Sequence, residues 1–220
     1  DIELHDYGWQ AIVGGFGFLT DRFPEPKLNV HTIDTINKTT MFNGKVKIPL
    51  KPFPGVMGVA PDTEEMLSTI PPRANGGNMD DPSIVEGTTV YFPVFVKGAL
   101  FSIGDAHAVQ GLGEVCGTAI EAPMTFVYRL RVLKNKPAIQ EPQYETDDFY
   151  AVTGFGKTID IATKKAVNFM VDHLSENYDI SAEDAYMLCS LVGDLKIAEV
   201  VDVPNMLVTM HFPKSILDQL

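Results

Sequence analysis

The residues best suited to chemistry lie in one glycine-rich stretch near the middle of the chain. Asp105 and His107 stand two positions apart, so in an extended segment both side chains project from the same face. Gln110, Glu114 and Glu121 follow among four glycines, whose backbone freedom lets the chain return carboxylates to the same point. Imidazole and carboxylate groups together suit zinc, manganese or another ion that prefers nitrogen and oxygen ligands. The simpler alternative is a polar pair at a strand end, in which Asp105 accepts a hydrogen bond from His107.

A second polar stretch precedes this one, in the turn-forming sequence Gly76-Gly-Asn-Met-Asp. Its glycines permit positive φ, and Asn78 and Asp80 stand two positions apart. Taken alone, the stretch is more typical of an Asx-rich turn that joins two strands than of a binding site. Cys116 is interpreted as a small buried residue and not as a nucleophile.

The elements that must position these side chains are predicted to be mainly β over the first 140 residues, where short apolar stretches alternate with turn residues. Segments 88–97 and 124–133 are rich in β-branched and aromatic residues, and both are predicted to be strands. Between them, segment 100–108 is apolar until it reaches Asp105 and His107. We therefore expect a buried strand that delivers polar groups at its end.

After Pro142 the apolar pattern of the sequence changes from strand-like to mixed helix and strand. Apolar residues recur at helical spacing over 160–178, which predicts one amphipathic helix. A second helix is predicted from Ser181, whose hydroxyl can cap it, to about Val192. Strand-like runs follow at 195–201 and 206–212.

Together these patterns predict a β-rich α+β fold, with a β-rich metal-site domain over 1–142 and an α+β C-terminal part over 143–220. A chain of 220 residues and 24.2 kDa can bury a core without disulfides. Its two cysteines are in no paired spacing, so a thiol-rich metal or redox site is not expected.

Charge and hydropathy narrow the class of partner. The net charge of −12 and the pI near 4.7 disfavour nucleic acid and anionic membranes, because both would be repelled over most of the surface. No apolar run approaches the roughly 20 residues that a spanning helix needs, and no signal-peptide pattern stands at the N-terminus. We therefore expect a cytoplasmic protein with no nucleic-acid partner and no membrane partner.

The two polar stretches belong to one longer pattern, GGNMD followed by EGxxxYFPVFxxGALxxxGDxHAxxGxGE and Val-Cys-Gly-Thr-Ala-Ile-Glu. This composite closely resembles the acetamidase/formamidase family. The resemblance continues through Lys51-Pro-Phe-Pro-Gly-Val-Met-Gly-Val-Ala-Pro upstream and Val200-Val-Asp-Val-Pro-Asn downstream, in the family's order, and covers most of the chain. It implies a jelly-roll-like β part followed by a smaller C-terminal α+β part, a divalent metal site, and hydrolysis of formamide- or acetamide-like amides to a carboxylate and ammonia.

The resemblance also suggests roles for individual residues. The metal ligands are expected to be Asp80, Asp105, His107 and Glu121. Glu114 is expected to be the catalytic acid/base, and Asn78 and Gln110 are expected to contact the substrate. The ion is expected to be zinc, with calcium or manganese as alternatives. It would polarise the amide carbonyl and lower the pKa of its bound water, while a carboxylate removes the proton and returns it to the leaving nitrogen.

Three departures from the family pattern leave an alternative open. Members usually have a further N-terminal region, so the chain is expected to open at Asp1 on a continuing strand. Asn75 stands where relatives commonly have His, and Leu112 where they commonly have Asp, and either change could weaken metal binding or activity. The alternative is a noncatalytic structural or small-molecule-binding relative of the same fold. The resemblance also favours a homodimer or a higher homo-oligomer.

Overall fold

The computed structural model describes residues 1–134 and 136–220. Strands predominate in these residues, and the helices come late in the chain. The first strands are β1 (Ile2–Leu4), β2 (Tyr7–Ile12), β3 (Lys27–Asp34), β4 (Thr39–Phe42), β5 (Val46–Pro49), β6 (Phe53–Gly58), β7 (Gly76–Asn78), β8 (Thr89–Tyr91), β9 (Ser102–Val109), β10 (Ile120–Glu121) and β11 (Met124–Phe126). The later elements are β12 (Gln143–Glu145), β13 (Phe149–Gly156), α1 (Ile159–Asn177), α2 (Ala182–Val192), β14 (Asp194–Glu199), β15 (Met206–Pro213) and α3 (Lys214–Leu217).

Two large antiparallel sheets organise the described part of the chain. The larger has the strand order β5-β4-β3-β2-β10-β9-β6-β7. The second has the order β14-β15-β13-β12-β8, and β1 pairs separately with β11. β8 belongs early in the sequence but joins the second sheet through its pairing with β12. In the larger sheet β9 lies between β10 and β6, so residues of β9 meet side chains from both neighbours.

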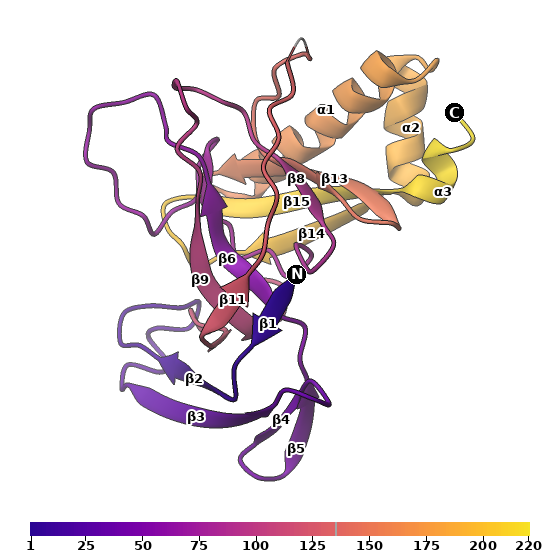
Figure 1. Ribbon diagram of the computed structural model, residues 1–220. Helices are drawn as coiled ribbons and strands as arrows, with labels where there is room; N and C mark the ends of the chain where they lie inside the picture. The colour runs from indigo at the N-terminus through magenta and orange to yellow at the C-terminus, as the bar shows by residue number, and fades with distance from the viewer. Residues whose placement is uncertain (135) are drawn as a thin grey trace.

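The helices cover the second sheet at the end of the molecule away from β3, β4 and β5 (Figure 1). α1 packs on β13 and β15. Its close approach requires glycine at Gly154, because a Cβ there would meet Ala162 O and lie 2.7 Å from Ala166 N. The Thr158 hydroxyl caps α1 by accepting from Ile161 N–H, which satisfies one of the free donors of the first turn.

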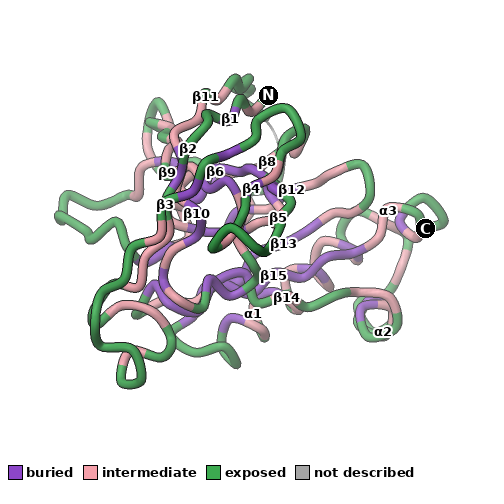
Figure 2. Tube along the Cα trace, turned by 90° about the horizontal axis from the view of Figure 1, so that it is seen from below, coloured by how far each residue is buried: buried purple, intermediate pink, exposed green. Residues whose placement is uncertain are grey.

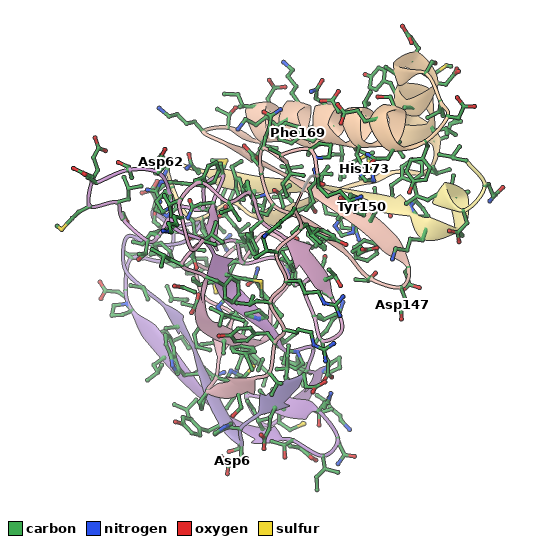
Figure 3. The ribbon with its side chains drawn as sticks, turned by 45° about the horizontal axis from the view of Figure 1, so that its top comes forward. Asp6, Asp62, Asp147, Tyr150, Phe169 and His173 are labelled. Carbon is green, nitrogen blue, oxygen red and sulfur yellow. The ribbon has the colours of Figure 1, made fainter. Side chains whose placement is uncertain are left out.

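The main apolar core lies between the helices and the second sheet. It contains Met170 and Leu174 of α1 and Phe212 of β15, all fully buried. Buried positions run along β13 and β15 in Figure 2. Figure 3 shows His173 beside Tyr150, where the imidazole stacks on the phenol with ring centroids 4.0 Å apart.

A smaller apolar cluster joins the two sheets. Met79, which directly follows β7 of the larger sheet, packs there with Tyr144 and Ala198 of the second sheet. All three side chains are essentially inaccessible to solvent. The end of β7 is therefore anchored against β12 and β14, and this junction positions the polar cluster described below.

The predictions of helices and strands are most accurate where the local sequence pattern determines the structure. The strand expected over 100–108 is confirmed as β9, although only His107 and Ala108 of it are buried. Both helices are confirmed within a residue or two. Ser181 caps α2 by accepting from Asp184 N–H, as its sequence predicts. The predictions for 88–97 and 124–133 were too long, because only the three-residue segments β8 and β11 are strands. β-propensity alone does not supply a pairing partner.

The sheets and late helices confirm a strand-rich fold with a helical C-terminal part. The jelly-roll arrangement and the division at residue 142 stay predictions. Within residues 1–134 and 136–220, no helix combines the length and apolar character needed to cross a membrane.

Candidate active site

His107 of β9 is the centre of the polar cluster, and only 1% of it is exposed. Its cross-strand neighbours are Phe53 of β6 and Glu121 of β10. The Phe53 ring meets the imidazole edge-on, with centroids 5.1 Å apart. Nε2 of His107 is 3.1 Å from Glu121 Oε2 and 3.4 Å from Asp105 Oδ2. Strand pairing therefore brings one imidazole nitrogen beside two carboxylates.

Asp80 faces the other imidazole nitrogen from the turn after β7. Its main-chain N–H donates to Gly55 O at 3.1 Å, which ties the turn to β6. Asp80 Oδ1 is 3.6 Å from His107 Nδ1 and has no hydrogen-bond partner among the described residues. A Cβ on Gly55 would meet Asp80 Oδ1 and lie 2.8 Å from His107 Cε1, so only glycine leaves room here. A buried carboxylate oxygen without a partner is a position that a cation can fill.

Glu114 reaches the cluster from a turn that docks against the second sheet. Gly113 N–H donates to Ala198 O at 2.7 Å, at the end of β14. Gly113 has φ +95° and Glu114 has φ +45°, so the turn swings the carboxylate inward. One ligand atom from each of Asp80, His107 and Glu114 lies within 4.8 Å of the others.

The carboxylates of the cluster are held on strained backbone. Asp80, Asp105 and Glu114 all have positive φ, at +42°, +50° and +45°. A non-glycine residue in such a conformation costs about 1–3 kcal/mol, and such strain concentrates at functional sites. Left-handed backbone at all three positions is what brings carboxylates from β9 and two separate turns to one imidazole.

Two further acids at the site were missed by sequence reasoning. Asp202 is 1% exposed, and its Oδ2 accepts from Asn78 Nδ2 at 2.7 Å. Glu199, at the end of β14, is fully buried, and its Oε2 accepts from Val201 and Asp202 main-chain N–H groups at 3.0 Å. Glu199 Oε1 has no partner among the described residues. The available signal was a pair of acids in an apolar run, with Glu199 inside the strand predicted over 195–201 and Asp202 directly after it.

The pKa values reflect an excess of buried negative charge. Burial lowers the pKa of His107, but its contacts with Asp105 and Glu121 and the charge of Asp80 outweigh burial and raise it to about 11. Burial raises the pKa of Glu114 to about 8. Burial likewise raises the pKa of Asp80, and the charge of Glu114 adds to the effect. One imidazolium does not neutralise these acids, so the cluster favours an added cation.

The two residues assigned to the substrate both contact protein groups of the cluster. Asn78 donates from Nδ2 to Asp202, as described. Gln110 Oε1 is 2.9 Å from His107 Nδ1, and Gln110 Nε2 donates to Asp80 O at 2.6 Å. The structure thus brings all seven predicted site residues into one region, although it does not test their individual roles.

Asn75 and Leu112, which depart from the family pattern, lie outside this cluster, and so does Cys116. Asn75 donates from Nδ2 to Val59 O at 2.7 Å, which supports the turn between β6 and β7. Leu112 is 49% exposed. Cys116 is part-buried, and its thiol donates to Thr118 O at 3.4 Å. None of the three is among the side chains gathered around His107.

Within residues 1–134 and 136–220, two groups of side chains fit a divalent cation, and they share one imidazole. The first is Asp105, His107 and Glu121, and the second is Asp80, His107 and Glu114, each with ligand atoms within 4.8 Å of one another. Imidazole with carboxylates suits zinc or manganese, and an oxygen-rich set also suits calcium. The partnerless Oδ1 of Asp80 agrees with a cation at the cluster. In a neutral imidazole only the unprotonated nitrogen can bind an ion, so the tautomer of His107 determines which of the two groups can use it.

Comparison with known proteins gives a consistent result. The sequence model of the Acetamidase/Formamidase family matches residues 63–219. A formamidase of Methylophilus methylotrophus is 26% identical over 280 aligned residues, which span 96% of this chain and 68% of that protein.

Solved structures support the same relationship. The crystal structure of an acetamidase from Bacillus halodurans superposes with a TM-score of 0.89 at 28% identity, over 100% of this chain and 73% of that one. A recombinant predicted acetamidase/formamidase from Thermoanaerobacter tengcongensis superposes with a TM-score of 0.89 at 33% identity, over 100% of this chain and 71% of that one.

Proposed function

Because the chain belongs to the acetamidase/formamidase family and is an amidase, we propose that it hydrolyses short linear amides such as formamide and acetamide to a carboxylate and ammonia. The observation that carries the proposal is the buried cluster in which His107 stands among carboxylates at 3.1–3.6 Å. The noncatalytic alternative loses its support, because the matching relatives are formamidases and acetamidases.

We propose further that a divalent metal ion binds at this cluster, with zinc favoured and calcium or manganese as alternatives. Asp105, His107 and Glu121 would hold it, with Asp80 as the fourth ligand expected from the sequence. When bound, such an ion would polarise the amide carbonyl and lower the pKa of its water. The excess of carboxylates and the partnerless Asp80 Oδ1 support this assignment.

Glu114 is proposed to move the proton. Its carboxylate would take a proton from the attacking water and return it to the leaving nitrogen, since an unprotonated amide anion is a very poor leaving group. Burial raises the pKa of Glu114 to about 8, and a carboxyl group that titrates near neutral pH can both accept and donate a proton.

Asn78 is proposed to orient the substrate. Its Nδ2 is committed to Asp202, which fixes the amide plane and leaves the Oδ1 atom to accept from an amide N–H of the substrate. We also propose a homodimer or a higher homo-oligomer on the family resemblance, and light scattering of the purified protein tests this.

Metal analysis combined with ammonia release tests the function. We expect one divalent ion per chain, and ammonia from formamide, acetamide and propionamide in unequal amounts, because one methylene changes pocket binding by about 1–3 kcal/mol. Chelation should stop the reaction, and the native ion should restore it. Ammonia release that survives complete removal of the ion would leave the amidase activity standing and refute metal dependence. An intact, metal-loaded chain that releases no ammonia from any of the three would refute the proposed substrate class.

A further inference from the structure

The side-chain amide of Gln110 has a fixed orientation at the end of β9. Gln110 Nε2 lies 2.6 Å from the main-chain carbonyl oxygen of Asp80, and Gln110 Oε1 lies 2.9 Å from His107 Nδ1. A carbonyl oxygen only accepts hydrogen bonds, so the NH₂ end of the amide must face Asp80. The amide oxygen must therefore face His107.

This orientation determines the protonation of the imidazole. The Gln110 Oε1 atom is an acceptor only, so His107 Nδ1 must carry a proton and donate it. In a neutral imidazole the lone pair then lies on Nε2, which is the only ring atom left to bind a cation. Nε2 is the atom that lies 3.1 Å from Glu121 Oε2 and 3.4 Å from Asp105 Oδ2.

We propose that Gln110 is a positioning residue that fixes the Nδ1-protonated tautomer of His107 and so directs a divalent ion to Nε2, between Asp105 and Glu121. The inference rests on the metal dependence proposed above and decides between the two groups that share His107. Asp80 Oδ1, 3.6 Å from Nδ1, then lies on the protonated side of the ring, so under this inference Asp80 is not the fourth ligand. Each end of the Gln110 amide makes one contact inside the protein, and this fixes its orientation.

The surroundings of the ring support a fixed imidazole. Phe53 meets it edge-on, and the Gly55 main chain lies so close to the ring that a Cβ there would be 2.8 Å from His107 Cε1. The bond to Asp80 O also ties the end of β9 to the turn that carries Asp80 at φ +42°. Gln110 thus connects the two polar stretches of the sequence through hydrogen bonds and not through charge.

The test measures zinc binding to the full chain after metal removal, by competition with a chromophoric chelator. Gln110→Ala should weaken zinc binding by about 10–100-fold, as loss of a hydrogen-bond partner to a ligating histidine typically does. Gln110→Glu keeps an acceptor opposite Nδ1 and should hold the same tautomer, but its second oxygen replaces the donor to Asp80 O, so its zinc affinity should lie between those of Gln110→Ala and the parent protein. Gln143→Ala is the matched control, because it removes a part-buried amide whose Oε1 accepts from Tyr150 Oη at 2.5 Å, far from His107 in the sequence and in the second sheet.

An NMR measurement of the His107 tautomer distinguishes a positioning role of Gln110 from a general loss of stability in its variants. Long-range ¹H–¹⁵N spectra of the zinc-loaded protein, with the His107 signals assigned by their loss in His107→Gln, should show zinc on Nε2 and a proton on Nδ1. Gln110→Ala should show a mixture of tautomers, and Gln110→Glu should restore the parent pattern.

Two outcomes overturn the inference in different ways. If Gln110→Ala binds zinc as tightly as the parent with the same tautomer, or if the parent holds zinc on Nδ1, Gln110 does not direct the ion, and the proposed function is untouched. If the parent protein itself binds no divalent ion, metal dependence fails first and this inference fails with it. The parent measurement alone distinguishes the two cases.

Discussion

Two of the three buried histidines in the described part of the chain, His107 and His211, have opposite surroundings. His107 of the larger sheet and His211 of the second sheet are 1% and 3% exposed. Burial lowers the pKa of both, yet that of His107 is raised to about 11 by its carboxylate neighbours, whereas that of His211 falls to about 3. Equal burial therefore gives a protonated ring in one place and a neutral ring in the other.

The opposite pKa shifts of the two histidines come from the groups that contact their ring nitrogens. His211 Nε2 is 3.0 Å from both Tyr144 Oη and Thr209 Oγ1, and its Nδ1 is 3.2 Å from Lys196 Nζ. These are hydroxyl and ammonium groups, which offer no ligand set for a cation and leave both nitrogens occupied. Around His107 the neighbours are carboxylates, and Asp80 Oδ1 has no partner within the described part of the chain. A buried histidine points to metal chemistry when its neighbours are acids with spare oxygen atoms, and to structure when its neighbours satisfy it.

The largest effect expected from this comparison is on activity. His107→Gln should lose the bound ion and lower ammonia release by roughly 10³-fold or more, because the several kcal/mol that a metal ion contributes to the transition state are lost with it. Mass spectrometry of bound metal and an ammonia assay on acetamide measure both quantities.

His211→Gln is the matched control. It should keep the ion and lower the free energy of unfolding by about 1–3 kcal/mol, because buried Tyr144 and half-buried Lys196 each lose a hydrogen-bond partner. Metal loss in both variants, or in neither, would show that the contrast between the two rings has no functional meaning.

The second prediction tests whether Glu114 transfers a proton or binds the ion in the cluster around His107. Glu114→Gln should keep near-parental metal content and lower ammonia release by about 10²–10⁴-fold, because the amide cannot accept the proton. Circular dichroism checks that the turn at Gly113 has kept the fold intact. If Glu114→Gln loses the ion, Glu114 is a ligand. If it hydrolyses amides at the parental rate, another group is the base, and Asp202 is the nearest unassigned acid.

A third prediction concerns the space around His107. Gly55→Ala places a methyl group against Asp80 Oδ1 and 2.8 Å from His107 Cε1, so the cluster must shift, and overpacking of this kind costs about 1–3 kcal/mol. Metal affinity should fall by about 10-fold or more. Gly104→Ala, on the neighbouring strand, meets nothing within 4 Å and should bind the ion like the parent. Equal affinities in the two variants would mean that the imidazole position is not critical.

The sequence predicted several of the residues around His107, but it did not predict Asp202 or Glu199. The two-residue spacing of Asp105 and His107 was enough to predict that their side chains meet, but the structure brings them together through left-handed backbone at Asp105, with φ +50°, and not through regular strand alternation. Asp202 and Glu199 could not be assigned, because their approach depends on the bond from Gly113 to Ala198, which joins distant segments across two sheets.

Gln110 illustrates the same limit on a smaller scale. Its spacing from His107 was visible in the sequence, but the carbonyl that orients its amide belongs to Asp80, 30 residues earlier. The strands expected over 88–97 and 124–133 failed for a related reason, since β-propensity does not reveal whether a partner strand will lie alongside. Local spacing is therefore readable from one sequence, whereas contacts between sheets are not.

The last effect expected is a dependence of stability on pH at Glu199, at the end of β14. Burial raises the pKa of Glu199 from 4.5 to about 8. Below pH 4.5 the group is protonated in the folded and the unfolded state and costs nothing. Between pH 4.5 and 8 only the unfolded state ionises, so stability falls as pH rises, by up to about 1.4 kcal/mol per pH unit, and the loss is complete above pH 8.

Glu199→Gln tests this in metal-free protein by urea unfolding at pH 5, 6, 7 and 8. The glutamine oxygen can still accept from the Val201 and Asp202 N–H groups, while its NH₂ replaces the partnerless Oε1 and does not titrate. The variant should therefore gain stability over the parent steadily from pH 5 to 8. His211→Gln should show the opposite trend and lose stability relative to the parent as the pH rises from 5 to about 6.5, because the parent's His211 is neutral in the fold, with a pKa lowered to about 3, while the unfolded chain protonates it below its ordinary pKa of 6.5. Parallel curves for Glu199→Gln would mean that Glu199 is ionised in the fold, and the excess negative charge around His107 would then extend into the second sheet.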